Sequence, residues 1–235
     1  MAKKSRTPPP PRKVQAPKRR ATERKGLSDQ HKRWILFGAA GSGIAGVAIA
    51  VGLIAAGGGG ANDKGVAQVL RNAGCTYRVY AQTSQEHVRS LAEKRYKYSF
   101  PPSGGPHFGQ PALFGNYGDP VEQGQAIHNL EHGAMLIEYG PKVPQSAIDR
   151  INAFYDESPN GLLVFPYAPL GKRIALVAWT ADVKKLARRN DRGYHGEGRV
   201  ALCTRFDEKA FETFRDRFRA KGPERFPLSA LAPGQ

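Results

Sequence analysis

The hydrophobic pattern of the chain begins with one long uncharged apolar segment. It runs from residue 34 to residue 56 and reads WILFGAAGSGIAGVAIAVGLIAA. As a helix it would span about 34 Å, enough to cross the hydrocarbon core of a bilayer. The last three residues, Ile54 to Ala56, resemble a signal-peptidase site, but both the leader and the apolar segment are long for a cleaved signal peptide. The pattern therefore predicts a retained, single-pass transmembrane helix at 34–56.

The segments on either side of this helix show no apolar periodicity. Residues 1–33 include four consecutive prolines and carry twelve Lys or Arg against two acidic residues, so they hold +10 of the formal charge of +16. Such a segment cannot bury enough apolar surface to offset the entropy of ordering, and we predict that it is a disordered tail. By the positive-inside rule the tail is cytoplasmic and the C-terminal part is extracytoplasmic. Residues 57–66 are rich in glycine and predict a flexible linker.

The basic tail suggests two kinds of partner. Beside a membrane helix, each Lys or Arg near the surface attracts anionic lipid headgroups with about 1 kcal/mol. Nucleic acid is the alternative partner. Because neither interleaved aromatic residues nor a folded reader module accompanies the charge, we expect anionic membrane lipids and not nucleic acid.

Beyond the linker, residues 67–228 predict one folded domain. Apolar alternation or short apolar runs predict strands at 75–82, 134–139, 162–167, 173–180 and 199–203. Apolar residues three or four apart predict helices at 144–158 and 208–222, and the phenylalanines of the second helix are expected in the core. Residues 99–124 hold five prolines and six glycines and predict a long loop. We expect an α+β domain, a mainly antiparallel sheet with helices on one face.

The chain has two cysteines, Cys75 and Cys203, both on the outer side of the predicted membrane helix. An even count in an oxidising compartment favours a disulfide, which would stabilise the domain by about 2–5 kcal/mol. Two buried free thiols are the alternative, because spacing alone does not fix their distance.

The chemistry-bearing residues are four of the six histidines, which lie in the loop-rich half of the domain: His87, His107, His128 and His132. His128 and His132 share one face whether their segment is helical or extended. Glu131 joins the face of His128 only in a helix. Because Gly133 is followed at once by the apolar run at 134–139, we predict a loop leading into a strand.

The segment HNLEH, residues 128–132, also matches the HxxEH pattern of zinc peptidases. In that pattern two helical histidines bind zinc, the glutamate acts as base and a distant carboxylate completes the site. Glu208 or Glu212 are the nominal candidates for the distant carboxylate. The predicted loop argues against this interpretation.

A metal site without catalysis suits the residue types better. Imidazoles with a carboxylate favour Zn²⁺, Cu²⁺ or iron over Mg²⁺ or Ca²⁺. Met135 would face away from His132 in a strand, so we do not count it as a Cu(I) ligand. The alternative is a polar network in which Glu131 accepts a hydrogen bond from a histidine and ties the loop to the sheet.

Several motifs resemble the domain-of-unknown-function family 3105. They are PPSGGPH at 101–107, GNYGDPVEQGQAIHNLEHGAMLIEY at 115–139, FPYAPL at 165–170, ALVAWT at 175–180 and FRDRFRAKGPE at 214–224. Members of this family are membrane-anchored or secreted, mostly actinobacterial or archaeal, and have no established activity. The resemblance implies an anchored extracytoplasmic domain, and the family's pattern residues fall on His87, His107, His128, Glu131, His132 and Gly133.

The sequence thus leads to one main hypothesis and two alternatives. The outer domain binds copper or zinc through His107, His128 and His132, with His87 or Glu131 as fourth ligand or orienting group, for metal storage, delivery or sensing. The first alternative is an interaction or scaffold module with structural histidines, facing an unknown cell-envelope protein. The second is a hydrolytic metalloenzyme with Glu131 as base, which we favour least.

Overall fold

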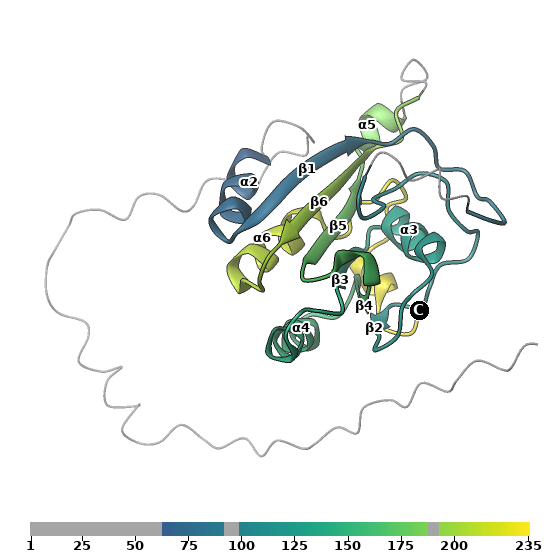
Figure 1. The fold of residues 1–235 in the computed structure, drawn as a ribbon. Coiled ribbons are helices and arrows are strands. Elements are labelled where there is room, and N and C mark those ends of the chain that lie inside the picture. Colours follow the sequence, from purple (N-terminus) through teal and green to yellow (C-terminus); the bar gives the residue numbers. More distant parts are fainter. Residues whose placement is uncertain (1–62, 92–98, 188–192) are drawn as a thin grey trace, which may run out of the picture. The chain divides into compact units, whose positions relative to one another are not determined.

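A computed structural model describes residues 63–91, 99–187 and 193–235 of the protein (Figure 1). The described strands form a six-stranded sheet in the order β1-β6-β5-β3-β4-β2. The predicted tail, the predicted transmembrane helix and most of the predicted linker lie outside these residues, as do residues 92–98. Within the described ranges, no helix is long and apolar enough to cross a bilayer.

The elements agree with most of the predicted pattern. The strands are β1 (Cys75–Ala81), β2 (Gly115–Asn116), β3 (Met135–Tyr139), β4 (Leu162–Pro166), β5 (Ile174–Thr180) and β6 (Glu197–Cys203). The described α-helices are α2 (Asp63–Asn72), α3 (Gln123–His132), α4 (Gln145–Glu157), α5 (Val183–Leu186) and α6 (Glu208–Phe218), and 3-10 turns lie at Ala168–Leu170 and Leu228–Leu231. The α+β class is therefore confirmed. Helix α2 begins at Asp63, where the pattern predicts a linker.

The sheet is mixed. The pairs β1–β6, β6–β5 and β5–β3 are antiparallel, whereas β4 runs parallel to both β3 and β2. Two parallel neighbours need a crossover connection, and α4 supplies it between β3 and β4. Every residue of β3 and β5 is buried, which explains why both strands read as continuous apolar runs.

Helices cover both faces of the sheet, so the prediction of helices on one face is wrong. Helices α2, α4 and α6 pack on the face that carries Met135 and Ile137, and the predicted phenylalanine stripe of α6 lies in this core. Helix α3 packs on the opposite face, where Ile127 and Leu130 share a cluster with Leu136 (Figure 1). The physical reason is that successive residues of β3 are apolar, and a strand with two apolar faces needs cover on both.

The predicted disulfide is present. Cys75 and Cys203 occupy paired positions on β1 and β6, and their sulfurs are bonded. They are 128 residues apart in sequence, so the bond joins the beginning of the described domain to its last strand. Neither cysteine is free.

One carboxyl group lies inside the protein on the α3 side of the sheet. Glu138 on β3 is fully buried, and its Oε1 accepts a hydrogen bond of 2.8 Å from Nε2 of Gln123 at the start of α3. Its Oε2 has no hydrogen-bond partner among the described residues. Burial raises the pKa of Glu138 to about 8, with Gln123 acting in the opposite direction. Glu138 is therefore mainly protonated at neutral pH.

Replacing Cys75 and Cys203 together with alanine should lower the free energy of unfolding by about 2–5 kcal/mol, because the bond restricts the unfolded chain. Urea denaturation of the full-length chain measures this difference. Reductant should destabilise the wild-type protein and leave the double variant unchanged. A double variant as stable as the oxidised wild type would contradict the structural role.

The pH dependence of stability should change in a Glu138→Gln variant. Between its ordinary pKa of 4.5 and about 8, the folded state holds a proton that the unfolded state releases. The wild-type protein therefore loses stability relative to the variant as pH rises through this window, and the difference stops growing above it. Melting temperatures from pH 5 to pH 9 test this expectation. Glu157→Gln, at an exposed position of α4, is the matched control. Identical dependence of the melting temperature on pH in Glu138→Gln and wild type would contradict the raised pKa of Glu138.

Candidate metal centre

Helix α3 carries the central part of the candidate site. The segment predicted as a loop is helical from Gln123 to His132, so that prediction is wrong. Gly133 ends the helix and does not prevent it: its φ is 106°, and the backbone N–H groups of Gly133 and Ala134 donate to the carbonyls of Leu130 and Asn129. This is a Schellman cap, which glycine favours. Glu131 and His132 therefore follow His128 by three and four residues, which places each of them beside His128 on the helix surface.

The proline- and glycine-rich loop carries His107 to this face. Asn129 of α3, fully buried, holds the loop with two hydrogen bonds to one residue: its Oδ1 accepts from the N–H of Ala112 at 2.9 Å and its Nδ2 donates to the Ala112 carbonyl at 2.8 Å. The backbone N–H of Phe108 donates to the carbonyl of Gly124 at the start of the same helix. The loop is thus attached to both ends of α3.

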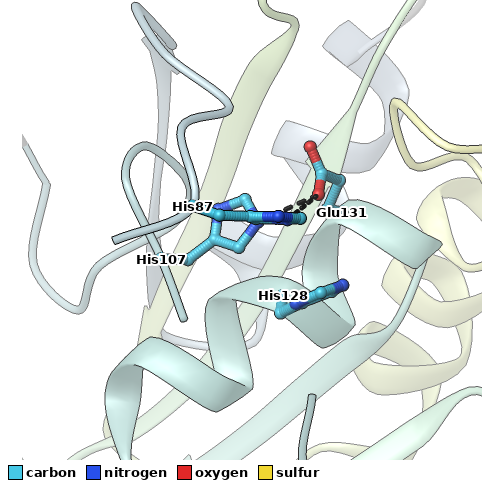
Figure 2. A group of neighbouring side chains, drawn as sticks. All are labelled: His87, His107, His128 and Glu131. Carbon is cyan, nitrogen blue, oxygen red and sulfur yellow. Dashed lines mark ion pairs between the residues drawn. The ribbon is translucent and has the colours of Figure 1, made fainter. Parts of the chain in front are cut away.

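A third segment brings His87 to the site. His87 and His107 form an isolated parallel β-bridge, in which the N–H of Val88 donates to the His107 carbonyl at 2.7 Å. The ring centroid of His87 lies 4.8 Å from that of His107 and 4.9 Å from that of His128. Three separate stretches of the chain therefore converge, as Figure 2 shows.

The side chains of His87, His107, His128 and Glu131 form the His–Glu cluster. One potential ligand atom from each lies within 4.8 Å of the other three. Oε2 of Glu131 is 2.9 Å from Nε2 of His107 and 3.8 Å from Nε2 of His87 (Figure 2). His107 is fully buried and the Glu131 side chain is 2% exposed, whereas the side chain of His87 is 52% exposed. The cluster is buried on one side and reaches solvent at His87.

Backbone carbonyls orient two of the imidazoles. Nδ1 of His107 lies 2.8 Å from the Gly105 carbonyl, and Nδ1 of His128 lies 2.7 Å from the Phe108 carbonyl. A carbonyl only accepts, so each Nδ1 must carry the hydrogen. In the neutral rings Nε2 then carries no hydrogen: that of His107 faces Glu131, and that of His128 lies 3.0 Å from Nε2 of His132. Metal-binding histidines are commonly held through their other nitrogen in this way.

The two most buried groups have no ordinary hydrogen bond at the centre of the cluster. Nε2 of His107 and Oε2 of Glu131 are close, yet neither has a hydrogen-bond partner of acceptable geometry among the described residues. The other oxygen of Glu131 accepts a hydrogen bond of 2.8 Å from Gln85. Buried polar atoms without partners are costly, so the arrangement suits an ion that both atoms could bind.

The charges in the cluster favour a cation. Burial alone would raise the pKa of Glu131, but His107 and Gln85 outweigh it and hold this pKa below its ordinary value. Burial alone would lower the pKa of His107, but the adjacent carboxylate and the Gly105 carbonyl raise it overall. Burial lowers the pKa of His128. The carboxyl group of Glu131 thus favours its charged form and the ring of His128 its neutral form, and these are the forms in which the two groups bind metals.

The donor set fits a transition metal. Three imidazole nitrogens and one carboxylate oxygen suit Zn²⁺, Cu²⁺ or Fe²⁺, with nitrogen ligands at about 2.0–2.1 Å from zinc. Met135 is buried in the core on the opposite face of the sheet, as expected for a residue that is not a ligand. Both cysteines form the disulfide, so neither offers a thiolate.

His132 lies beside the His–Glu cluster and not within it. Its Nε2 is 3.0 Å from Nε2 of His128 and 3.2 Å from Oε2 of Glu224. The predicted set of His107, His128 and His132 is thus only partly brought together. Two residues near the site, Gln85 and Glu224, were not predicted. No pattern marks them, because both reach the site through tertiary contacts.

The helical HxxEH segment removes the reason given above for rejecting a peptidase. Glu131 does share a face with His128, as expected for a helix. The nominal distant carboxylates, Glu208 and Glu212, lie instead on α6, which packs on the opposite face of the sheet. Glu224 is the carboxylate beside the motif.

The link between the loop and α3 can be tested at Asn129. Replacing it with alanine leaves the N–H and carbonyl of Ala112 without partners, and each unsatisfied buried group costs about 1–3 kcal/mol. We expect a clear drop in melting temperature. Asn72→Ala, at an exposed position at the end of α2, is the control and should change stability by at most about 0.5 kcal/mol. Equal effects of the two substitutions would contradict the proposed role of Asn129.

Comparison with known proteins supports the resemblance noted in the sequence. A family model with the description "Protein of unknown function (DUF3105)" matches residues 87–226, a range that includes the whole His–Glu cluster and Glu224. No curated protein and no solved structure has detectable similarity to the chain. Because the match covers more than half of the chain, this protein belongs to the domain-of-unknown-function family 3105.

Proposed function

We propose that this protein is a single-pass membrane protein whose extracytoplasmic domain binds a transition metal, copper or zinc, through the His–Glu cluster. The bound ion would be stored, delivered or sensed at the cell surface. His107, His128 and Glu131 would form the buried part of the site, and His87 the ligand nearest to solvent.

One observation carries this proposal. Nε2 of His107 and Oε2 of Glu131 lie 2.9 Å apart in a buried position, both without a hydrogen-bond partner of acceptable geometry among the described residues. The rings of His107 and His128 are held through Nδ1, which leaves their Nε2 atoms available to a metal. Ligands held in place before the ion arrives lose little conformational entropy on binding.

The proposed location rests on separate features. The apolar segment at 34–56 is long enough for a bilayer, and the basic residues before it favour a cytoplasmic tail that contacts anionic lipids. The Cys75–Cys203 disulfide is typical of proteins in oxidising compartments. A domain held at the outer surface would meet metal ions from outside the cell, and a cell-envelope protein would be its natural partner.

Binding is favoured over catalysis because Glu131 is already engaged. Its Oε1 accepts from Gln85 and its Oε2 faces His107. A general base needs a free oxygen directed at water, within hydrogen-bond reach. Glu131 is better placed to ligate or to orient a ligand than to abstract a proton.

Metal uptake by the full-length chain in detergent tests the proposal. Wild-type protein should bind one Cu²⁺ or Zn²⁺ tightly, and the metal should raise the melting temperature, because an ion bound at about 100 times its Kd stabilises the folded state by about 2.7 kcal/mol. A His107→Gln/His128→Gln variant should lose this uptake. In a Trp34→Phe background, Cu²⁺ should also quench Trp179, whose ring centroid is 6.0 Å from that of His107.

The control is His31→Gln, which removes a histidine from the predicted tail and should leave metal binding unchanged. Structural histidines make a different prediction: the double variant would melt lower than wild type by the same amount with and without metal. Wild-type protein that takes up no more Cu²⁺ or Zn²⁺ than the double variant would rule out the metal site.

A further inference from the structure

His132 and Glu224 do not belong to the His–Glu cluster. They lie next to it, on the side of His128 that is closer to solvent. The side chain of His132 is 17% exposed and that of Glu224 is 48% exposed, in contrast to the buried His107 and Glu131. The ring of Phe226 lies against that of His132, with centroids 4.3 Å apart. A second group of potential ligands therefore borders the first.

Backbone hydrogen bonds of the C-terminal segment hold Glu224 close to α3. The N–H of Glu224 donates to the Glu131 carbonyl at 3.0 Å, and the N–H of Ala220 donates to the Gly133 carbonyl at 2.8 Å. Gly222 allows this close approach, because a Cβ at that position would collide with the Glu131 carbonyl oxygen. The backbone of residues 220–224 is thus fixed to the end of α3, and the carboxylate of Glu224 is held at His132.

The two distances measured from Nε2 of His132 are close to those between neighbouring ligands of a single ion. Nε2 of His132 is 3.0 Å from Nε2 of His128 and 3.2 Å from Oε2 of Glu224. Two ligands of a tetrahedral zinc ion, each about 2.0–2.1 Å from the metal, lie about 3.3 Å apart. One hydrogen on His132 cannot fully serve two acceptors, whereas a cation between the three atoms would serve all of them.

From this geometry we infer that His128, His132 and Glu224 form a second, outer cation position, which takes Zn²⁺ or another borderline divalent ion. This inference rests on the proposed function, because it shares His128 with the inner cluster. Nδ1 of His128 is committed to the Phe108 carbonyl, so this ring has one nitrogen for one ion. The two positions therefore compete for His128, and the outer one, with three protein ligands and greater exposure, is the weaker.

Competition for His128 limits how many ions the protein can hold at once. An ion at the outer position can move to the inner one when Nε2 of His128 remains its ligand and His107 and Glu131 replace His132 and Glu224. Wild-type protein should then hold one tightly bound ion. Loss of the inner ligands should reveal weaker binding that depends on Glu224.

Zn²⁺ titration of full-length variants against a chromophoric chelator tests this inference. The background variant is His87→Ala/His107→Gln, and it should bind Zn²⁺ more weakly than wild type. Adding Glu224→Gln should weaken the remaining affinity by at least about tenfold. Adding Glu157→Gln, which removes the same charge from an exposed position of α4, should leave it unchanged. If the background does not fold, His87→Ala/Glu131→Gln serves in its place.

Each outcome separates the two proposals. Tight binding by wild type, with residual binding that requires Glu224, supports the outer position. Tight binding by wild type, with no residual binding or with residual binding that ignores Glu224→Gln, overturns the outer position alone. Wild-type protein that binds no Zn²⁺ overturns the outer position, and if it takes up no Cu²⁺ either, the inner site is overturned as well.

Discussion

Removing the Glu131 carboxylate from water imposes the main constraint on this half of the domain. A buried carboxylate costs several kilocalories per mole unless other groups replace its hydration. Here Gln85 donates to one oxygen, and the other faces His107 and His87. These partners come from two segments that contain almost no regular structure, so both segments must stay against α3 for the carboxylate to keep them. Asn129 and the backbone bonds of Phe108 and Val88 hold the segments there.

The sheet makes such a buried site possible. Because β3 and β5 are apolar on both faces, helices must cover both, and α3 occupies the face left open by α2, α4 and α6. The apolar side of α3 packs on the sheet through Ile127 and Leu130, which leaves its polar residues facing the loop. The C-terminal segment then closes over the end of the same helix. A rigid helix therefore presents the ligands, and loops complete the site from outside.

The sequence predicted what local patterns control. Continuous apolar runs marked β3, β4 and β5, and the phenylalanine spacing marked α6. The even cysteine count, with a predicted oxidising compartment, favoured the disulfide that is found. The same reasoning missed α3, because Gly133 was taken to break a helix that it actually caps. Residue types alone indicated a histidine and glutamate site. Gln85 and Glu224 could not be found in this way, since their roles depend on which distant segments meet.

X-ray absorption spectroscopy of the zinc-loaded, full-length protein can show whether the histidines bind the ion, because it counts the ligands around it. We expect a first shell of nitrogen and oxygen ligands at about 2.0–2.1 Å, with the outer-shell scattering of about three imidazoles. His107→Gln should remove part of that imidazole signal. A shell of oxygen ligands alone, with no imidazole scattering, would show that the histidines do not bind the metal.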